Sequence, residues 1–251
     1  MNTIPDNTSF GLAVNPTDDD LRPVMESRWA AGAPYAIDQW PAIIAEHSVA
    51  TKLIPIDTSE IEAIYDHTNP NCVAVLQKYA DLIDQAIGWE PHFIRLSTRS
   101  PKDATYPVLP VTLSGKQAMD WIAQSERCMD DIVVARIAQK PIYIALRKRY
   151  HAPPAGEFRA YAKGGKLLAV SRYDYHEPAK VDYSQIDIMG IVEAFHRDVI
   201  AQAYDDVVFD LELGAYGHEG PLLIEVNPYG LSDPCLFGSY EAIEQEGGFR
   251  A

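Results

Sequence analysis

The residues best suited to chemistry in this sequence are three oxygen-bearing side chains, Asp210, Glu225 and Asn227. They stand in two runs that alternate apolar and polar residues, a pattern typical of half-buried strands. If the two runs form an antiparallel hairpin, Asp210 lies opposite Glu225, and Asn227 is next on that face. Facing like charges repel, and a divalent cation removes the repulsion. Carboxylates with an Asn carbonyl suit Mg²⁺, so the spacing predicts a magnesium site; a solvated polar face on an edge hairpin has the same pattern.

The register of this hairpin follows from matching the apolar faces of its strands. We pair Leu211 with Ile224 and Leu213 with Leu222, because this alignment keeps the apolar residues on one side and the acidic residues on the other. Pro228 then ends the second strand, since proline cannot donate a hydrogen bond to a neighbouring strand.

A second hairpin is predicted over residues 157–174, where two alternating runs meet at the Gly-Gly pair 164–165. Two glycines readily supply the positive φ angles of a tight turn. A two-residue turn pairs Glu157 with Arg172 and places Arg159 on the same face. A cross-strand Glu–Arg pair is an ordinary device of sheets, whereas Arg159 beside it has no such partner. Arg159 is therefore a candidate for binding phosphate.

Basic residues are concentrated in one part of an acidic chain. The formal net charge is −15 at pH 7, yet the stretch from Arg95 to Arg172 holds 14 of the 21 basic residues and 6 of the 36 acidic ones. The overall charge argues against nonspecific binding of nucleic acid or an anionic membrane, since both need a basic surface. The basic stretch predicts a focused pocket for a small polyanion such as a nucleoside triphosphate, or else a docking face for an acidic protein.

The scaffold that positions these residues is bounded by length and composition. A chain of 251 residues with 47% hydrophobic and 23% charged residues is globular and has room for one large domain or two lobes. No run approaches the roughly 18 apolar residues of a membrane span, and the N-terminus lacks a signal-peptide pattern, so we expect a cytoplasmic protein. Three cysteines without CxxC spacing indicate buried thiols.

We expect residues 1–90 to form a mainly helical scaffold and residues 91–251 a nucleotide-binding region, either as two domains or as one compact two-lobed unit. The first 20 residues are polar and are interpreted as a loosely packed lead-in. Helices are predicted over 41–45, 59–66, 73–87, 114–122 and 186–204, and strands over 52–56, 92–97 and 142–146.

Four ordered motifs make the chain resemble the cell division cycle protein 123 family, whose members have the ATP-grasp fold. The motifs are FIRLSTRSPKDA at 93–104, IALRKRY at 144–150, EFRAYAKGGKLLAVSRYDY at 157–175, and VVFDLEL at 207–213 followed by LLIEVNPYGLSDPCLF at 222–237. They cover most of the chain from Phe93 onward. The resemblance implies an α+β fold of two lobes with antiparallel sheets and the nucleotide site between them.

The resemblance also implies which residues hold ATP and Mg²⁺. Around the nucleotide it places Arg95, Lys102, Asp103, Ala145, Arg147, Glu157, Arg159, Arg172 and Asp233, and as magnesium ligands Asp210, Glu225 and Asn227. By resemblance, Arg95 lies over the phosphates, Lys102 and Asp103 belong to an SPKD-like loop, and the backbone of 145–147 reads adenine. Glu225 stands where many members carry Asp, and Arg95 where others carry Lys, so charge is kept while reach differs.

Two functions of different class follow from the resemblance. ATP-grasp enzymes typically join a carboxylate to an amine or thiol, with arginines, here Arg159 and Arg172, stabilising the charge that develops. Eukaryotic relatives instead use bound ATP while acting as an assembly chaperone for translation initiation factor 2. Arg99, Lys148 and Arg149 exceed what phosphate binding needs and, unless they are surface charges, offer a pocket for an acceptor carboxylate. Together with the shortness of the chain beside eukaryotic members, these residues favour an ATP-dependent ligase or phosphotransferase that acts on an unidentified acceptor.

Overall fold

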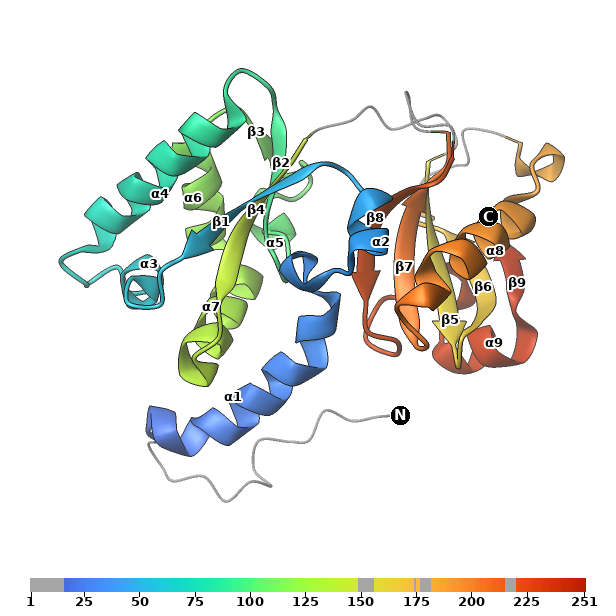
Figure 1. The fold of residues 1–251 in the computed structure, drawn as a ribbon, viewed down its shortest axis with the longest axis horizontal. Coiled ribbons are helices and arrows are strands. Elements are labelled where there is room, and N and C mark those ends of the chain that lie inside the picture. Colours follow the sequence, from blue (N-terminus) through green and yellow to red (C-terminus); the bar gives the residue numbers. More distant parts are fainter. Residues whose placement is uncertain (1–15, 149–155, 174, 177–181, 215–219) are drawn as a thin grey trace.

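The structure, a computed structural model, describes residues 16–148, 156–173, 175–176, 182–214 and 220–251. Two sheets with their helices form two lobes that lie side by side (Figure 1). The first lobe contains α1 (Asp18–Gly32), β1 (Thr51–Ile56), α3 (Ile61–Tyr65), α4 (Cys72–Ile87), β2 (His92–Leu96), α5 (Lys102–Thr105), β3 (Val111–Thr112), α6 (Gly115–Gln124), α7 (Glu126–Ala138) and β4 (Ile142–Lys148). The second contains α2 (Ala42–Glu46), β5 (Glu157–Lys163), β6 (Lys166–Arg172), α8 (Ile188–Asp198), β7 (Val207–Glu212), β8 (Leu222–Asn227), α9 (Tyr240–Glu246) and β9 (Gly248–Arg250).

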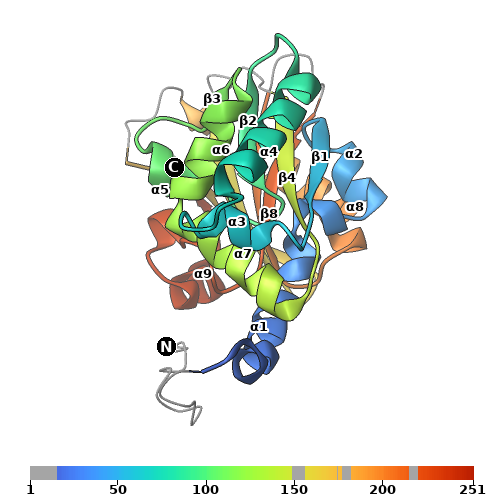
Figure 2. The same ribbon diagram turned by 90° about the vertical axis from the view of Figure 1, so that its left-hand side faces the viewer.

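The first lobe is a four-stranded antiparallel sheet in the order β1-β4-β2-β3. Its helices α4, α6 and α7 cover one face, as Figure 2 shows from the side. On α4 the buried Val75, Tyr79, Ile83 and Ile87 recur every four residues, so one stripe of the helix faces the sheet. Helices α4 and α6 approach closely at Gly115, where a Cβ atom would lie 1.9 Å from the carbonyl oxygen of Ala80. Glycine is therefore required there.

The second lobe is a five-stranded sheet in the order β8-β7-β5-β6-β9, antiparallel except that β9 runs parallel to β6. Helices α2 and α8 lie on one face and α9 on the other (Figure 2). Phe158 and Phe209 pack toward α8 with Ile44 of α2, while Tyr161 and Phe237 form a smaller core beside α9. This second face also carries the acidic residues of β7 and β8, and α9 covers it only in part.

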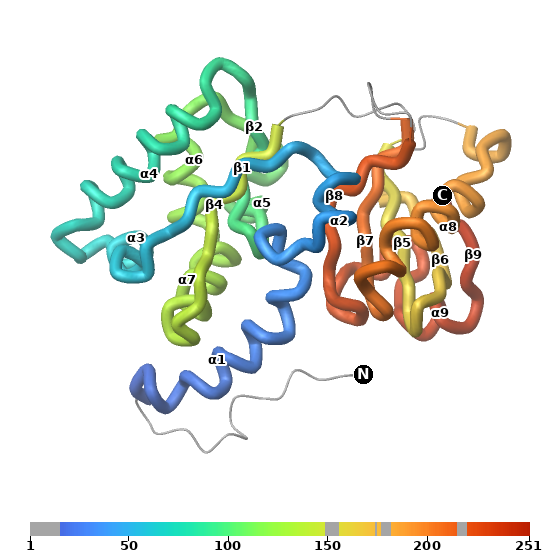
Figure 3. The backbone as a smooth tube through the Cα atoms, viewed as in Figure 1, coloured from blue at the N-terminus to red at the C-terminus, as the bar shows by residue number. Residues whose placement is uncertain are grey.

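The chain crosses between the lobes before it reaches β1 (Figure 3). Helix α2 packs into the core of the second lobe, although α1 before it and β1 after it belong to the first. Strand β1 pairs with β4 along its whole length, so elements on both sides of residue 90 share one sheet.

Most elements expected from the sequence are confirmed, as are the α+β class and two sheets that are mainly antiparallel. The predicted helix over 186–204 is shorter, ending at Asp198 and followed by the 3-10 turn Ile200–Gln202. The aspartates assigned to a loose lead-in form the first turn of α1, where Thr17 and Asp20 make a capping box. Helices α1, α5, α7 and α9 and strands β3 and β9 were not predicted. No helix of the described ranges is long and apolar enough to cross a membrane.

Candidate functional site

Strands β7 and β8 bring the predicted acidic pair together. Asp210 pairs directly with Glu225, and Asn227 lies two residues further along the same face of β8. The remaining pairings differ from prediction, since Leu211 meets Leu223 rather than Ile224, and Leu222 meets Glu212 rather than Leu213. The reason is a bulge after Asp210, which takes up one residue of β8 and shifts every later pair.

A second bulge changes the hairpin of β5 and β6. The turn and the Lys163–Lys166 pair are as predicted, but the register shifts between Tyr161 and Ala162. Beyond the shift Arg172 pairs with Phe158, not with Glu157. The prediction that Arg172 shares a face with Glu157 and Arg159 is therefore wrong, because paired residues of an antiparallel ladder project to the same side. Arg172 lies on the face that carries Phe158 and α8.

Arg159 and Asp210 form a buried bidentate ion pair. Arg159 Nε donates to Oδ1 of Asp210 and Nη2 donates to Oδ2, both at 2.8 Å, and the two side chains are 7% and 1% exposed. Burial raises the pKa of Asp210, while Arg159 opposes that rise. The guanidinium carbon lies 4.6 Å from the ring centroid of Tyr173, within the range of a cation–π contact. The arginine singled out for phosphate thus has a partner that the sequence did not indicate.

Arg95 crosses from the first lobe to reach Glu225. Its Nη1 lies 2.7 Å from Oε1 of Glu225, and two main-chain carbonyls, those of Leu96 and Thr98, accept hydrogen bonds from Nε and Nη2 at 3.0 and 2.8 Å. Burial works to raise the pKa of Glu225, but Arg95 and Lys102 outweigh it and lower the pKa to about 2. Glu225 is therefore firmly ionised between the two lobes.

Lys102, at the start of α5, completes the cluster. Its Nζ lies 5.6 Å from the ring centroid of Tyr173. Burial works to lower the pKa of Lys102, but Tyr173 and the carboxylates of Glu225, Glu157 and Asp210 raise it overall. Three cations and three carboxylates thus meet where the lobes face each other: Arg95, Lys102, Arg159, Glu157, Asp210 and Glu225. We call these six residues the charge cluster.

Asp103 and Asp233, two acidic residues predicted to bind the nucleotide, instead accept hydrogen bonds from neighbouring loops. Asp103 accepts hydrogen bonds from Ser125 Oγ at 2.6 Å and from the backbone N–H of Arg127 at 3.2 Å, so it holds the N-terminus of α7. The carboxylate of Asp233 accepts from the backbone N–H of Cys235 at 2.8 Å and from the hydroxyl of Tyr175 at 2.9 Å. Its main-chain carbonyl lies 3.4 Å from Nη1 of Arg159. Asp233 therefore supports the turn beside the charge cluster.

The strand assigned to adenine binding has its backbone occupied. Ala145 pairs with Leu53 on one side and with Arg95 on the other, because β4 is an interior strand. Its N–H and C=O therefore belong to the sheet and are not offered to a base, which argues against the adenine-reading role of 145–147. Arg147 donates to the main-chain oxygen of Ile224 at 2.6 Å and to Ser48 Oγ at 2.8 Å. Residues 149–155, which follow this strand, lie outside the described residues.

Two of the three basic residues predicted to bind an acceptor carboxylate are paired with acidic side chains of the protein. Arg99 makes two hydrogen bonds to Asp131, at 2.9 and 2.5 Å. Lys148 pairs with Glu90 at 3.0 Å. Arg149 lies outside the described residues. Among the residues that the structure describes, the predicted second anion pocket therefore does not form.

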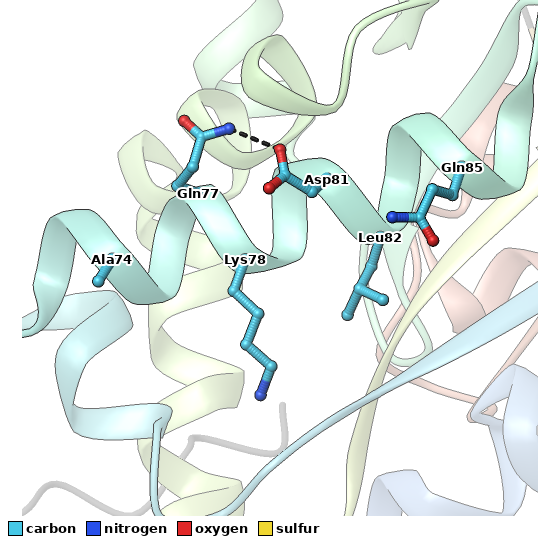
Figure 4. Close-up of a pocket in the computed structure, with 6 residues that line it drawn as sticks. All are labelled: Ala74, Gln77, Lys78, Asp81, Leu82 and Gln85. Carbon is cyan, nitrogen blue, oxygen red and sulfur yellow. Dashed lines mark hydrogen bonds between the residues drawn. The ribbon is translucent and has the colours of Figure 1, made fainter.

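The charge cluster is the feature that fits a ligand, and the surface hollow beside α4 does not. A hollow of about 560 Å³ runs along the outer side of α4, where Gln77 bonds to Asp81 (Figure 4). One helix supplies all of its lining, remote from the charge cluster. Within the described ranges no three His, Cys, Asp or Glu side chains converge as a metal site. The magnesium ligands that remain are two facing carboxylates and the Asn227 amide, a hard oxygen set that suits Mg²⁺ with phosphate oxygens.

Comparison with known proteins gives a consistent family assignment. The pattern of the D123 family matches residues 57–248. A translation initiation factor eIF2 assembly protein of Danio rerio is 27% identical over 161 residues, which span 58% of this chain and 45% of that relative. The chain thus corresponds to less than half of the length of the relative.

Solved structures with the same fold support that assignment. Cdc123 of Schizosaccharomyces pombe superposes with a TM-score of 0.70 at 17% identity, covering 88% of this chain and 96% of that one. Its C-terminally truncated form gives a TM-score of 0.68 at 16% identity, covering 90% and 96%. At these identities the likeness concerns the fold, and the ATP-grasp fold expected from the sequence is confirmed.

Proposed function

The chain belongs to the D123 family, and on that premise we propose that it binds ATP together with Mg²⁺ at the charge cluster between its lobes. The observation that carries this proposal is that Arg95 and Arg159 are each paired with a carboxylate of the predicted magnesium site. A triphosphate could replace the carboxylates as the partner of the two arginines, and a divalent cation could replace the arginines as the partner of the two carboxylates. The arginines and Lys102 would bind phosphate oxygens, while Asp210, Glu225 and Asn227 would hold Mg²⁺.

The exchange of partners explains why both ligands are needed together. Removing one partner of a buried ion pair costs about 3–5 kcal/mol, since the remaining charge is left without compensation. A triphosphate alone would draw Arg159 away from Asp210 and leave that buried carboxylate unpaired. Mg²⁺ supplies the compensating charge and orients the phosphates. We therefore expect binding of the nucleotide and of Mg²⁺ to be cooperative.

Calorimetry on the purified chain tests this proposal. ATP should bind more tightly than ADP, and ADP more tightly than AMP, with Mg²⁺ required and the preference weakening as salt increases. Asp210→Asn, which keeps the size of the side chain, should abolish the Mg²⁺ dependence. Equal affinity of the wild-type protein for AMP and ATP would show that the charge cluster is not the phosphate site.

The use of the bound nucleotide is better explained by protein assembly than by ligation. A ligase needs a pocket for its acceptor, and the described cations proposed for one, Arg99 and Lys148, are paired with Asp131 and Glu90. The Danio rerio relative is named as an eIF2 assembly protein, and we extend that role to this chain as an ATP-dependent assembly factor. Purified initiation factor 2 subunits should bind in the presence of ATP and Mg²⁺ and not to Asp210→Asn. ATP turnover that depends on small carboxylate and amine acceptors would instead favour the ligase.

A further inference from the structure

A second set of contacts joins the two lobes outside the charge cluster, along the edge strand β8. Arg147 Nη1 donates to the main-chain oxygen of Ile224 at 2.6 Å, and Nη2 donates to Ser48 Oγ at 2.8 Å. Ser48 Oγ in turn donates to the main-chain oxygen of Leu223 at 2.6 Å. The backbone N–H of Leu223 donates to the carbonyl of His47 at 2.9 Å. Both carbonyls thus bonded immediately precede Glu225 in the sequence.

The side chain of Arg147, which makes these contacts, is as buried as a core residue. Arg147 is 4% exposed, and its guanidinium carbon lies 5.9 Å from the ring centroid of Trp40. Trp40 packs on the core of the second lobe and donates its indole N–H to the carbonyl of Tyr35 at 2.9 Å. The guanidinium is therefore clamped between a ring and a strand of the second lobe, although its backbone belongs to the first.

Arg147 and Arg95 are fixed relative to each other by the first sheet. Ala145 pairs with Arg95 across β4 and β2, and Arg147 follows two residues later, so both arginines project from one face. They contact successive positions of β8, since Arg147 binds the carbonyl of Ile224 and Arg95 binds the carboxylate of Glu225. A rigid sheet thus sets the position of β8 at two adjacent points, one within the charge cluster and one outside it.

We propose that Arg147 and Ser48 form an interlobe latch that positions Glu225 opposite Arg95 and thereby sets the affinity of the site for nucleotide and Mg²⁺. This inference rests on the proposed nucleotide binding and assigns Arg147 a positioning role in place of adenine contact. The latch uses main-chain carbonyls of an edge strand, which nucleotide and Mg²⁺ do not compete for. When Arg95 and Glu225 change partners, the latch therefore keeps β8 in register with the first sheet.

The planar fork of arginine is what the latch requires. One guanidinium bonds the Ile224 carbonyl and the Ser48 hydroxyl in fixed relative directions, whereas a lysine ammonium is a point charge on a flexible stem. Arg147→Lys should therefore retain charge but lose the fixed direction of the second bond. Ser48→Ala removes one link between Arg147 and the Leu223 carbonyl and leaves the Ile224 bond in place.

The test measures interlobe geometry and nucleotide affinity separately. Spin labels at Gln85→Cys on α4 and Gln245→Cys on α9 report the distance between the lobes, and both native positions are exposed. The native cysteines Cys72, Cys128 and Cys235 are buried, which favours labelling at the introduced sites. The distance distribution is recorded without ligand and with ATP and Mg²⁺, and calorimetry gives the affinity of each variant.

We expect Arg147→Ala to broaden the distance distribution and to weaken binding of ATP with Mg²⁺ by about tenfold or more. Arg147→Lys should have a smaller effect on both measurements, and Ser48→Ala a smaller effect still. These two variants test the latch even if Arg147→Ala does not fold. Lys148→Ala, an exposed neighbour paired with Glu90, is the control and should change neither measurement.

An unchanged distance distribution in folded Arg147→Ala, Arg147→Lys and Ser48→Ala would overturn the latch, and so would broadening without any loss of affinity. Failure of the wild-type chain to bind ATP would overturn the proposed function instead. The ligand-free distance distribution would then still decide whether Arg147 fixes the lobes.

Discussion

The two lobes bring opposite charges to the surface where they meet. The first lobe contributes the cations Arg95 and Lys102, from the end of β2 and the start of α5. The second contributes Glu157, Asp210 and Glu225 from strands and only one cation, Arg159. The carboxylates lie on paired strands and are fixed by the sheet, whereas Lys102 stands on a four-residue helix after a loop. The three carboxylates are thus held by paired strands, as are Arg95 and Arg159, and Lys102 is the one member of the charge cluster that lies outside a strand.

This difference also separates the two ion pairs of the charge cluster. The Arg159–Asp210 pair lies wholly within the second lobe, so its loss affects the folding of that lobe. The Arg95–Glu225 pair joins the lobes, so its loss affects how they are held together. Substitutions at the two pairs should consequently give distinguishable results, although both pairs consist of an arginine and a carboxylate.

The largest effect is expected from Asp210→Asn. The substitution leaves the buried Arg159 without a charge partner, and breaking a buried pair in this way costs about 3–5 kcal/mol of unfolding free energy. Without Arg159, loss of one of the two facing carboxylates would instead relieve their repulsion and stabilise the protein. Urea denaturation at neutral pH measures the change. Asp198→Asn, at an exposed carboxylate paired with Arg197, is the matched control and should have a much smaller effect, because solvent screens an exposed ion pair.

A smaller effect, with a pH signature, is expected at the interlobe pair. The pKa of Glu225 is lowered from 4.5 to about 2, so its ionised form stabilises the folded protein above pH 4.5, and this contribution is lost as pH falls toward 2. By linkage, this pKa shift contributes about 3 kcal/mol to the free energy of unfolding at neutral pH. Glu225→Gln should remove it and flatten the fall in stability between pH 4.5 and 2. If the wild-type protein and Glu225→Gln lost stability in parallel over that range, the pair would not be the cause.

The sequence was sufficient to place Asp210 opposite Glu225 but not to find their partners. Period-two alternation identifies strands and faces, and the short connection between β7 and β8 makes them natural neighbours. Arg95 and Glu225 are 130 positions apart, and no local pattern indicates that the lobes bring them together. The bulge that places Arg172 on the other face is equally hidden, since one extra residue leaves the alternation on either side intact.

Helix α7 was not predicted because its burial also depends on tertiary contacts that no local pattern shows. It lies between α1 on one side and the core of the first lobe on the other, so its buried residues are distributed around much of the helix. Those residues are Cys128, Ile132, Val134, Ala135, Ile137 and Ala138. A helix buried on two sides lacks the single apolar stripe that identifies a surface helix. Tertiary packing, rather than local propensity, therefore decides its existence.

A still smaller effect separates the neighbours Lys102 and Asp103. Asp103→Ala removes the hydrogen bonds at the N-terminus of α7 and should cost about 1 kcal/mol of unfolding free energy. Its affinity for ATP with Mg²⁺ should stay at the wild-type value, because the carboxylate faces α7. Lys102→Ala should show the opposite pattern, with weaker nucleotide binding as its main effect. Calorimetry and thermal unfolding of both variants check this division, which would be refuted by weaker ATP binding in Asp103→Ala.

The smallest effect on nucleotide binding is expected from Arg172→Ala. Arg172 was predicted to act beside Arg159, but it pairs with Phe158 and lies on the other face of the second sheet. Phosphates bound by the charge cluster would be separated from it by the sheet, so its removal should change ATP affinity by less than about twofold, a difference within about 0.4 kcal/mol. Arg159→Ala is the comparison, and it should lose most of the affinity because Arg159 belongs to the charge cluster that we propose binds the phosphates. Both variants remove one guanidinium from the same hairpin, so they have the same net charge; they differ in the face from which it is lost and in the Asp210 pair that Arg159→Ala also breaks. Titration of each variant with ATP and Mg²⁺ decides the matter, and a comparable loss in both would mean that long-range charge, and not the position of Arg159 in the charge cluster, determines nucleotide affinity.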